Sequence, residues 1–95
     1  MAVIVAGHLF VDAADRAEYL HGCVEAMELA RRSDGCLDFS LTPDPIDPCR
    51  INVFEHWDSV DAVEAFRGSG PSDEQATAIR DAVVYQHVIG SSTRL

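Results

Sequence analysis

The spacing of hydrophobic residues changes along the chain, and each change predicts a new element of secondary structure. Residues 2–11 are almost continuously apolar and rich in β-branched side chains, which is typical of a buried strand. Asp12 or Asp15 can then cap a helix that extends to about Ser33, because apolar residues recur there every three or four positions. The side chains that we expect this helix to bury are Ala17, Leu20, Cys23, Val24, Met27 and Ala30.

A different period follows this helix. Leu37, Phe39 and Leu41 alternate with polar residues, which is the two-residue period of a half-buried strand. The prolines within residues 43–48 (PDPIDP) cannot continue that strand, so we expect a rigid connection there.

Two more strands are predicted over residues 50–57 and 83–89. Successive side chains of a strand point to opposite faces of its sheet. In the first of these strands, one face therefore carries Ile51, Val53, Glu55 and Trp57. The other face carries Asn52, Phe54 and His56.

A second helical region lies between these strands. Asp58 or Ser59 can cap a short helix with apolar residues at Val60, Val63 and Phe66. The segment GSGPS (68–72) ends that helix. Ser72-x-x-Gln75 is a capping box, which predicts a further helical piece over residues 73–82.

The predicted order of elements is βαββαβ, and this order fits a single domain over residues 1–95. A ferredoxin-like α+β sandwich has this order, with both helices on one side of the sheet. The other side of the sheet would then be uncovered, although several strands carry apolar residues on both faces. Two copies packed sheet against sheet close this surface most simply. We therefore expect a homodimer.

Composition excludes several classes of partner. The net charge of −9 argues against nucleic acid and against anionic membrane surfaces, both of which attract basic patches. The chain contains no apolar run long enough to span a membrane, and its first strand is not preceded by the basic residues of a signal peptide. Three cysteines at spacings that match no metal motif fit a reducing, cytoplasmic compartment.

Residues 35–66, GCLDFSLTPDPIDPCRINVFEHWDSVDAVEAF, combine several features in a specific order. Gly-Cys-Leu follows the first helix, a proline-rich connection leads to Glu55-x-Trp57, and Asp58-Ser59 precedes an Ala-Val helix. In this order they resemble the antibiotic biosynthesis monooxygenase family, whose members are small dimeric α+β barrels. The resemblance implies a homodimer that binds a flat aromatic or polyketide-like molecule. It also implies oxidation of phenols or anthrones by O₂ without a metal, flavin or other cofactor.

The chain departs from the family pattern at its second helix. Many members carry histidines on and just after this helix, where the present chain has Phe66 and Pro71. The haem-degrading branch uses Asn, Trp and His at positions that correspond to Gly7, Phe66 and Ala76. We therefore do not expect haem degradation.

Three histidines are the candidate catalytic bases. His8, His56 and His87 fall on predicted strands that a ferredoxin-like order places side by side, so they can share one face. A histidine can deprotonate a phenolic substrate, whose anion then reacts with O₂. The alternatives are ordinary structural or surface histidines, which are commoner, and a three-histidine metal site, which no motif supports. We expect no metal.

The expected substrate-binding residues are Asn52, Glu55, Trp57, Phe66 and Tyr85. Trp57 and Phe66 can form an aromatic wall, and Asn52 and Tyr85 offer polar groups to a phenolic ligand. Glu55 can orient a histidine or a substrate hydroxyl, although it can equally bond the backbone or pair with an arginine. The predicted function is cofactor-independent oxidation of a small aromatic substrate. The alternatives are a non-catalytic binding protein and a proton-abstracting isomerase on the same scaffold.

Overall fold

A computed structural model describes residues 1–68 and 77–95 of the chain. Its strands are β1 (Val3–Phe10), β2 (Cys36–Pro43), β3 (Arg50–Trp57) and β4 (Asp81–Val88). A short 3₁₀ turn, η1 (Ala13–Asp15), precedes helix α1 (Arg16–Arg32), and α2 (Val60–Arg67) follows β3. No helix in these two ranges is long and apolar enough to cross a membrane.

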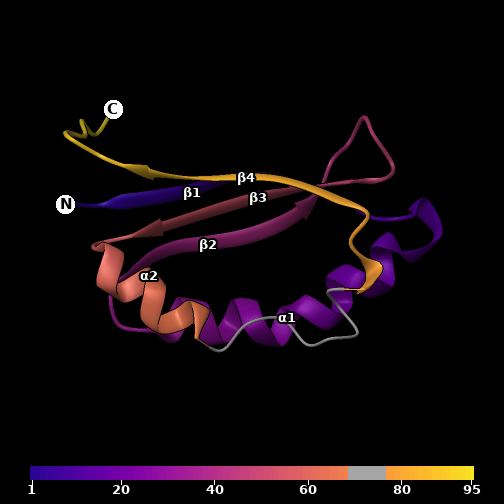
Figure 1. The fold of residues 1–95 in the computed structure, drawn as a ribbon, viewed down its shortest axis with the longest axis horizontal. Helices are drawn as coiled ribbons and strands as arrows, with labels where there is room; N and C mark the ends of the chain where they lie inside the picture. The colour runs from indigo at the N-terminus through magenta and orange to yellow at the C-terminus, as the bar shows by residue number, and fades with distance from the viewer. Residues whose placement is uncertain (69–76) are drawn as a thin grey trace.

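The four strands form one antiparallel sheet in the order β2-β3-β1-β4, and α1 and α2 lie on the same side of it (Figure 1). This arrangement is the ferredoxin-like α+β fold, which confirms the predicted fold class. The strand bounds predicted for residues 50–57 are those of β3.

The pairing register divides the sheet into two faces. Val5 lies opposite Glu55 of β3 and Gln86 of β4, and directly opposite residues share a face. The face that contains Val5 points toward the helices, and we call it the helix-facing side. The face that contains Ile4, Ala6 and His8 has no helix over it in the described structure, and we call it the uncovered face.

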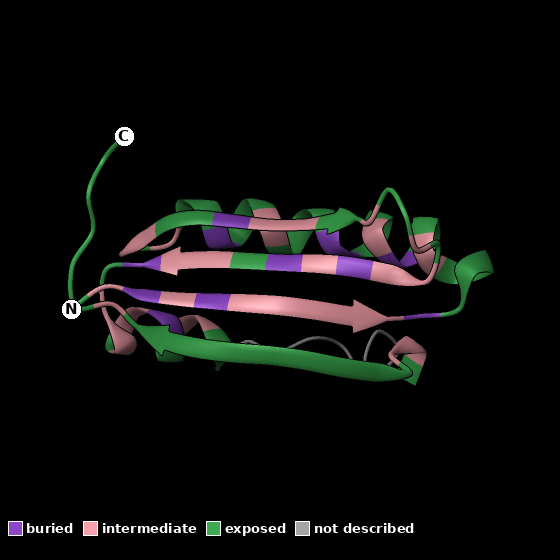
Figure 2. Ribbon diagram, turned by 90° about the horizontal axis from the view of Figure 1, so that it is seen from above, coloured by how far each residue is buried: buried purple, intermediate pink, exposed green. Residues whose placement is uncertain are grey.

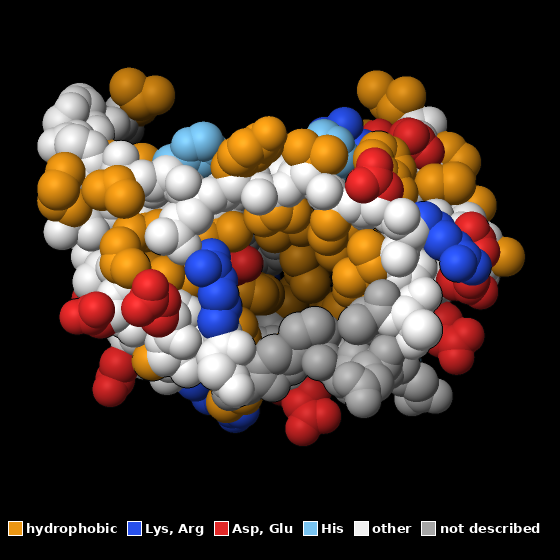
Figure 3. Space-filling view, viewed as in Figure 1, with side chains coloured by type: hydrophobic (Ala, Val, Ile, Leu, Met, Phe, Trp, Pro, Cys, Tyr) orange, Lys and Arg blue, Asp and Glu red, His pale blue; other side chains and the backbone are white. Residues whose placement is uncertain are grey.

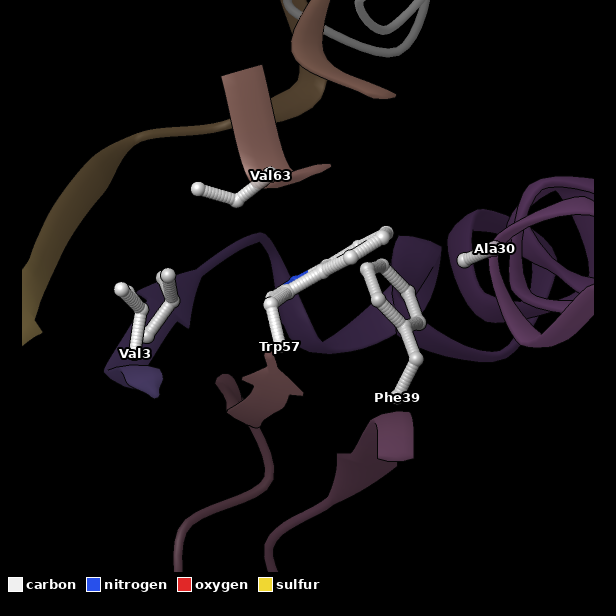
Figure 4. Packing of buried hydrophobic residues seen from close by; sticks show 6 residues of the cluster. Val3, Ala30, Phe39, Trp57 and Val63 are labelled. Atoms are coloured by element: carbon white, nitrogen blue, oxygen red, sulfur yellow. The ribbon is translucent and has the colours of Figure 1, made fainter. Parts of the chain in front are cut away.

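The core lies between the helix-facing side and the two helices. Trp57 is fully buried there, and Val3, Phe39, Val63 and Ala30 surround it (Figure 4). A second cluster at the other end of the sheet contains Val11, Tyr19, Cys23 and Ile51. Helix α1 packs mainly against β2, and strand β4 is exposed along its whole length (Figure 2).

The buried stripe of α1 differs from the predicted one. Its buried residues are Tyr19, Cys23 and Ala30, with Met27 partly buried, whereas Val24 is 42% exposed. These four positions follow steps of four, four and three residues, which is one face of a helix. The predicted stripe did not include Tyr19. Its large ring nevertheless contributes more apolar area than a nearby alanine does, and the helix is rotated to bury it.

Two predicted caps also have different outcomes. Ser59 caps α2 as predicted, because its hydroxyl accepts a hydrogen bond of 3.1 Å from the Ala62 N–H. Neither Asp12 nor Asp15 makes a side-chain cap. Asp12 instead binds Arg80 with an Oδ2–Nη2 distance of 3.0 Å, which ties the start of the helical region to the start of β4.

The prediction of helix through residue 82 is wrong at its end. Asp81 begins β4, and the Arg80 N–H already donates to the Phe10 carbonyl at 2.8 Å. Strand pairing with β1 therefore outweighs local helix propensity in this segment. The predicted capping box of Ser72 and Gln75 lies outside the described residues.

Candidate functional site

A hollow lined by hydrophobic side chains opens between the sheet and the helices (Figure 3). Its floor is the helix-facing side of the sheet. Gly7 lies at the centre of that side, with Val53 on one neighbouring strand and Val84 on the other. Val84 is 38% exposed even though it points to the helix side, so the hollow remains accessible along β4.

At Gly7 the backbone of β4 occupies the space that a side chain would need. The Gly7 φ of +156° is one that residues with side chains rarely adopt, and an added Cβ would lie 2.7 Å from the Val84 Cα. The strand therefore cannot accept an asparagine here without moving β4.

Glu55 is the acidic side chain that β3 places on the helix-facing side. It lies between Val5 of β1 and Phe39 of β2, and it is only partly exposed. Its Oε1 accepts a hydrogen bond of 3.0 Å from the indole Nε1–H of Trp57. The two side chains can meet because residues two apart on a strand share a face. This bond fixes the orientation of the carboxyl group.

The surroundings of Glu55 shift its proton affinity. Burial among apolar side chains raises the pKa of Glu55, because desolvation disfavours the charged form. The hydrogen bond from Trp57 and the positive charge of Arg67 on α2 lower the pKa, but by less than burial raises it. A carboxyl group with a raised pKa in an apolar hollow is a candidate acid or base.

Three aromatic rings lie beside this carboxyl group. The ring centroid of Phe66 is 5.3 Å from that of Trp57 and 5.5 Å from that of Phe39, at angles that are tilted and edge-on. These rings come from three elements, namely β2, β3 and α2. Phe39 and Trp57 are buried, whereas Phe66 is partly exposed and can reach a bound molecule.

The structure divides the predicted site residues between the two faces of the sheet. Glu55, Trp57 and Phe66 come together on the helix-facing side. The sheet separates them from the other predicted site residues, which lie on the uncovered face: His8, Asn52, His56, Tyr85 and His87. Glu55 therefore does not orient any of these histidines.

The three histidines share a face, as expected, but they do not meet. His56 and His87 lie on either side of Ile4, which separates their strands by about 10 Å. His8 lies four residues further along β1, at about 13 Å from Ile4. Within residues 1–68 and 77–95, no group of three or more His, Cys, Asp or Glu side chains can hold a metal ion.

Asn52 has partners that belong to the proline-rich connection. Its Oδ1 accepts a hydrogen bond of 2.7 Å from Arg50, and its Nδ2 donates to Asp44 at 3.0 Å. These bonds hold the connection against β3. Since Arg50 bonds here and lies on the uncovered face, it is Arg67 that acts electrostatically on Glu55.

Sequence reasoning missed Phe39 as part of the aromatic group. The alternation around Phe39 predicted correctly that it is buried, but it did not indicate which aromatic residues it meets. That information depends on the β2–β3 register, which places Phe39 opposite Glu55.

These features define a class of protein, namely a ferredoxin-like domain with an acidic residue in an apolar hollow between sheet and helices. Residues 2–83 match the family model of antibiotic biosynthesis monooxygenases, and the chain belongs to that family. The family name indicates a monooxygenase type of function in general terms. No curated protein matches the chain.

Solved structures share the fold over nearly the whole chain. A protein from Deinococcus radiodurans, provisionally named an antibiotic biosynthesis monooxygenase, superposes with a TM-score of 0.83 at 22% identity, over 98% of this chain and 97% of the other. One from Chloroflexus aurantiacus J-10-fl with the same provisional name gives 0.78 at 23% identity, over 99% and 98%. A conserved protein from Methanosarcina mazei Go1 gives 0.79 at 15% identity, over 92% and 91%. At these identities the likeness concerns the fold alone.

Proposed function

We propose that this protein is a cofactor-independent monooxygenase that oxidises a small aromatic substrate, such as a phenol or an anthrone, with O₂. The substrate binds in the hollow, and Glu55 is the catalytic base. The observation that carries this proposal is the partly buried carboxyl group of Glu55, oriented by Trp57 beside three aromatic rings. The histidines on the uncovered face are separated from the hollow by the sheet, so the proposal assigns them no role in this step.

The walls of the hollow favour a flat, largely apolar ligand. The partly exposed ring of Phe66 offers an aromatic surface for stacking or edge contacts, which are worth about 0.5–1.5 kcal/mol beyond simple burial. The apolar floor around Gly7 and Val53 gains from contact with an aromatic ring because that contact removes apolar surface from water. The Glu55 carboxyl is bonded to Trp57 of this wall, and it would select a ligand with an acidic hydroxyl or C–H group.

Glu55 takes the proton in the first step. Its raised pKa makes the Glu55 carboxylate a stronger base than a solvent-exposed glutamate. The pKa difference between Glu55 and a phenol or an anthrone is therefore smaller, which favours transfer of the substrate proton. The bond from Trp57 keeps one oxygen occupied, so the other oxygen is left to accept the substrate proton. The result is an electron-rich substrate anion in the hollow.

The anion then reacts directly with O₂. It gives one electron to O₂, and the resulting radical pair combines to form a carbon–oxygen bond and a peroxide anion. The proton held by Glu55 returns to this peroxide. Cleavage of the O–O bond with loss of the remaining C–H proton gives a carbonyl group and water, so that CH₂ and O₂ become C=O and H₂O. The apolar surroundings limit water in the hollow and thereby protect the radical pair.

Oxygen uptake with a panel of anthrones and hydroquinones tests this proposal. We expect uptake by the purified protein and a loss of about 10²–10⁴-fold in kcat for Glu55→Gln, which is the usual contribution of a general base. Glu64→Gln on α2 is the matched control, because it removes the same charge from an exposed position and is expected to keep full activity. Full activity is also expected for three histidine variants, each assayed as a dimer: His8→Ala, His56→Ala and His87→Ala.

Four outcomes would contradict the proposal. Full activity of Glu55→Gln would remove Glu55 as the base, and loss of activity in a histidine variant that still dimerises would move the site to the uncovered face. Aromatic ligands that bind without turnover would favour a binding protein. Exchange of a substrate proton with solvent, with no oxygen consumed, would favour the isomerase.

We also propose that the protein is a homodimer joined through the uncovered face. The support for this is the set of large apolar side chains that this face exposes, with Phe54 at 37%, Val83 at 38% and Tyr85 at 64%. Phe54 lies on β3 and Val83 and Tyr85 lie on β4, with Ala6 of β1 between Phe54 and Tyr85. Together they form an apolar patch, and patches of this kind mark interaction surfaces. Light scattering at micromolar concentration tests the dimer, and a monomer mass would contradict it.

A further inference from the structure

The side chains of the uncovered face form cross-strand rows with a regular layout. One row is His56, Ile4 and His87, and the next is Phe54, Ala6 and Tyr85. The third row is Asn52, His8 and Val83. Aromatic and aliphatic side chains thus occupy the centre, and histidines occupy both neighbouring rows.

Permanent charges are confined to the margins of this face. Arg50 and Asp81 lie on either side of Phe10 at one end, and Asp38 lies on the edge strand β2, opposite His56. Among the described residues of the three central rows there is no Asp, Glu, Lys or Arg. In a chain with 24% charged residues and a net charge of −9, this leaves the three histidines as the groups that can bring charge to the interior of the face near neutral pH.

The dimensions of the face fit a second copy of the chain. Eight-residue strands at ~3.3 Å per residue are about 27 Å long, and four strands ~4.8 Å apart are about 19 Å wide. Each copy therefore contributes about 500 Å², and two copies bury about 1,000 Å² together, which is the lower size of a stable interface. An interface at this lower limit has little energy to spare for burying charge.

We propose that the uncovered face is a proton-sensitive interface, in which two copies associate while His8, His56 and His87 are neutral and separate when these histidines become protonated. This proposal rests on the homodimer proposed above. In the single chain His8 and His56 are partly buried and His87 is exposed, so water reaches all three imidazoles. Between two apolar sheet faces, a protonated imidazole would lose its hydration and face the identical residues of the other copy.

The neighbours of each histidine do not offer a full set of compensating charges. Asp38 lies opposite His56 and is already beside it in the single chain, so association adds nothing to that pair. His8 packs edge-on against Phe10 at 5.2 Å and lies opposite Asn52, which binds Arg50. The neighbours of His87 are Ile4 and, at 6.3 Å, the ring of Tyr85. Two further carboxylates lie closer to His8 than to His87. Asp81 is one row away from His8 on β4, and Asp44 accepts a hydrogen bond of 3.0 Å from the Nδ2–H of Asn52, the residue opposite His8.

The general charge of the chain acts in the opposite direction. Two copies with a net charge of −9 repel each other, and lowering the pH toward the pI of about 4.6 reduces this repulsion. Without the histidines, association would therefore become tighter at lower pH. A weaker association at pH 5.5 than at pH 8 can arise only if groups within the interface resist protonation.

The expected size of the effect follows from proton linkage. A free imidazole is protonated about ten to one at pH 5.5, so holding one imidazole neutral weakens association about 10-fold. A two-fold dimer contains each histidine twice. Complete exclusion of protons from one of the three positions thus weakens association about 100-fold, and the other positions add to this.

The test is the dimer dissociation constant, measured by sedimentation equilibrium at pH 8.0 and pH 5.5. For the unmodified chain we expect an increase of about 100-fold or more at pH 5.5. For the variant H8Q/H56Q/H87Q we expect no increase, since glutamine keeps a polar side chain of similar size and cannot be protonated. His21→Gln is the matched control, because His21 is exposed on α1 and its removal is expected to leave the pH dependence intact. Circular dichroism at both pH values verifies folding, and the three single variants replace the triple variant if that variant does not fold.

Each result decides a different point. A dimer with the same or a lower dissociation constant at pH 5.5 overturns the proton-sensitive interface and leaves the dimer intact. An equal pH dependence in the histidine-free variant overturns the role of these histidines. A monomer at both pH values overturns the dimer itself. None of these results affects the assignment of Glu55, which oxygen uptake tests separately.

Discussion

The hydrogen bond between Trp57 and Glu55 can be tested by removing its donor. In Trp57→Phe the ring is largely kept, but the indole N–H that binds Oε1 at 3.0 Å is lost. Because this bond stabilises the charged form of the carboxyl group, its loss is expected to raise the pKa of Glu55 further. Hydrogen bonds to charged groups contribute ~1.5–3 kcal/mol, and one pKa unit corresponds to ~1.4 kcal/mol. Glu55 is only partly buried, so we expect the lower end of this range, an upward shift of about one unit.

The measurement is a pH titration of the Glu55 carboxyl carbon by NMR in the unmodified chain and in Trp57→Phe. If the protein oxidises its substrate as proposed, the acidic limb of the pH–rate profile shifts upward by the same amount. Phe66→Leu is the control, because it removes an aromatic neighbour of Trp57 without removing a hydrogen bond to Glu55. A pKa that is unchanged or lower in Trp57→Phe would refute the positioning role of the indole, even if the variant were less stable because of the smaller ring.

Three further predictions concern stability. The raised pKa of Glu55 means that the folded state binds this proton more tightly than the unfolded state, so stability declines as the pH rises from about 4.5 through the folded pKa. In calorimetry, Glu55→Gln is therefore expected to melt at a higher temperature than the unmodified chain at pH 7 and to lose this advantage at pH 4. Hydrogen bonds from Asn52 and from the backbone lower the pKa of Asp44 to about 2, so the Asp44 carboxylate contributes to stability above pH 3.8 and loses this contribution as the pH falls toward 2. Asp44→Asn is expected to make stability fall less steeply between these pH values, and an unchanged acid dependence of unfolding would contradict this. Ser59→Ala is expected to lower the free energy of unfolding by about 1 kcal/mol in urea titrations because the Ala62 N–H loses its cap, and a change below ~0.3 kcal/mol would show that the cap is unimportant.

Local patterns were sufficient for the strands but not for every helix boundary. The alternation over residues 50–57 predicted both the bounds and the two faces of β3, because a strand with one buried face repeats every two residues. Residues 73–82 contain helix-forming residues in sequence, yet pairing of Asp81 with Phe10 of β1 makes Asp81 and Ala82 the start of β4. That pairing joins residues far apart in the chain, and no local pattern contains it.

The site was predicted in its residue types but not in its grouping. The sequence indicated that Glu55 and Trp57 share a face, since this depends only on their spacing. It did not indicate which of the two sides of the sheet the helices would cover near each candidate. Because β3 has polar residues on both faces, the sequence allowed either Glu55 or His56 to join the site. The structure separates them by the thickness of the sheet.

This separation assigns different physical demands to the two faces. A base in the hollow works best with a raised pKa, and the sheet and helices provide this by excluding water around Glu55 within a single chain. An interface of limited size requires uncharged side chains, and the three central rows around Ile4, Ala6 and His8 meet this requirement only while the histidines are neutral. The same strands thus carry one titratable group whose ionised form is needed and three whose ionised form is unfavourable. Both demands are met while Glu55 is ionised and the histidines are neutral, and acid would remove each of them through a different group on a different face. A Glu55→Gln chain that still dimerises with unchanged pH dependence would show that the two faces titrate independently, as their separation by the sheet requires.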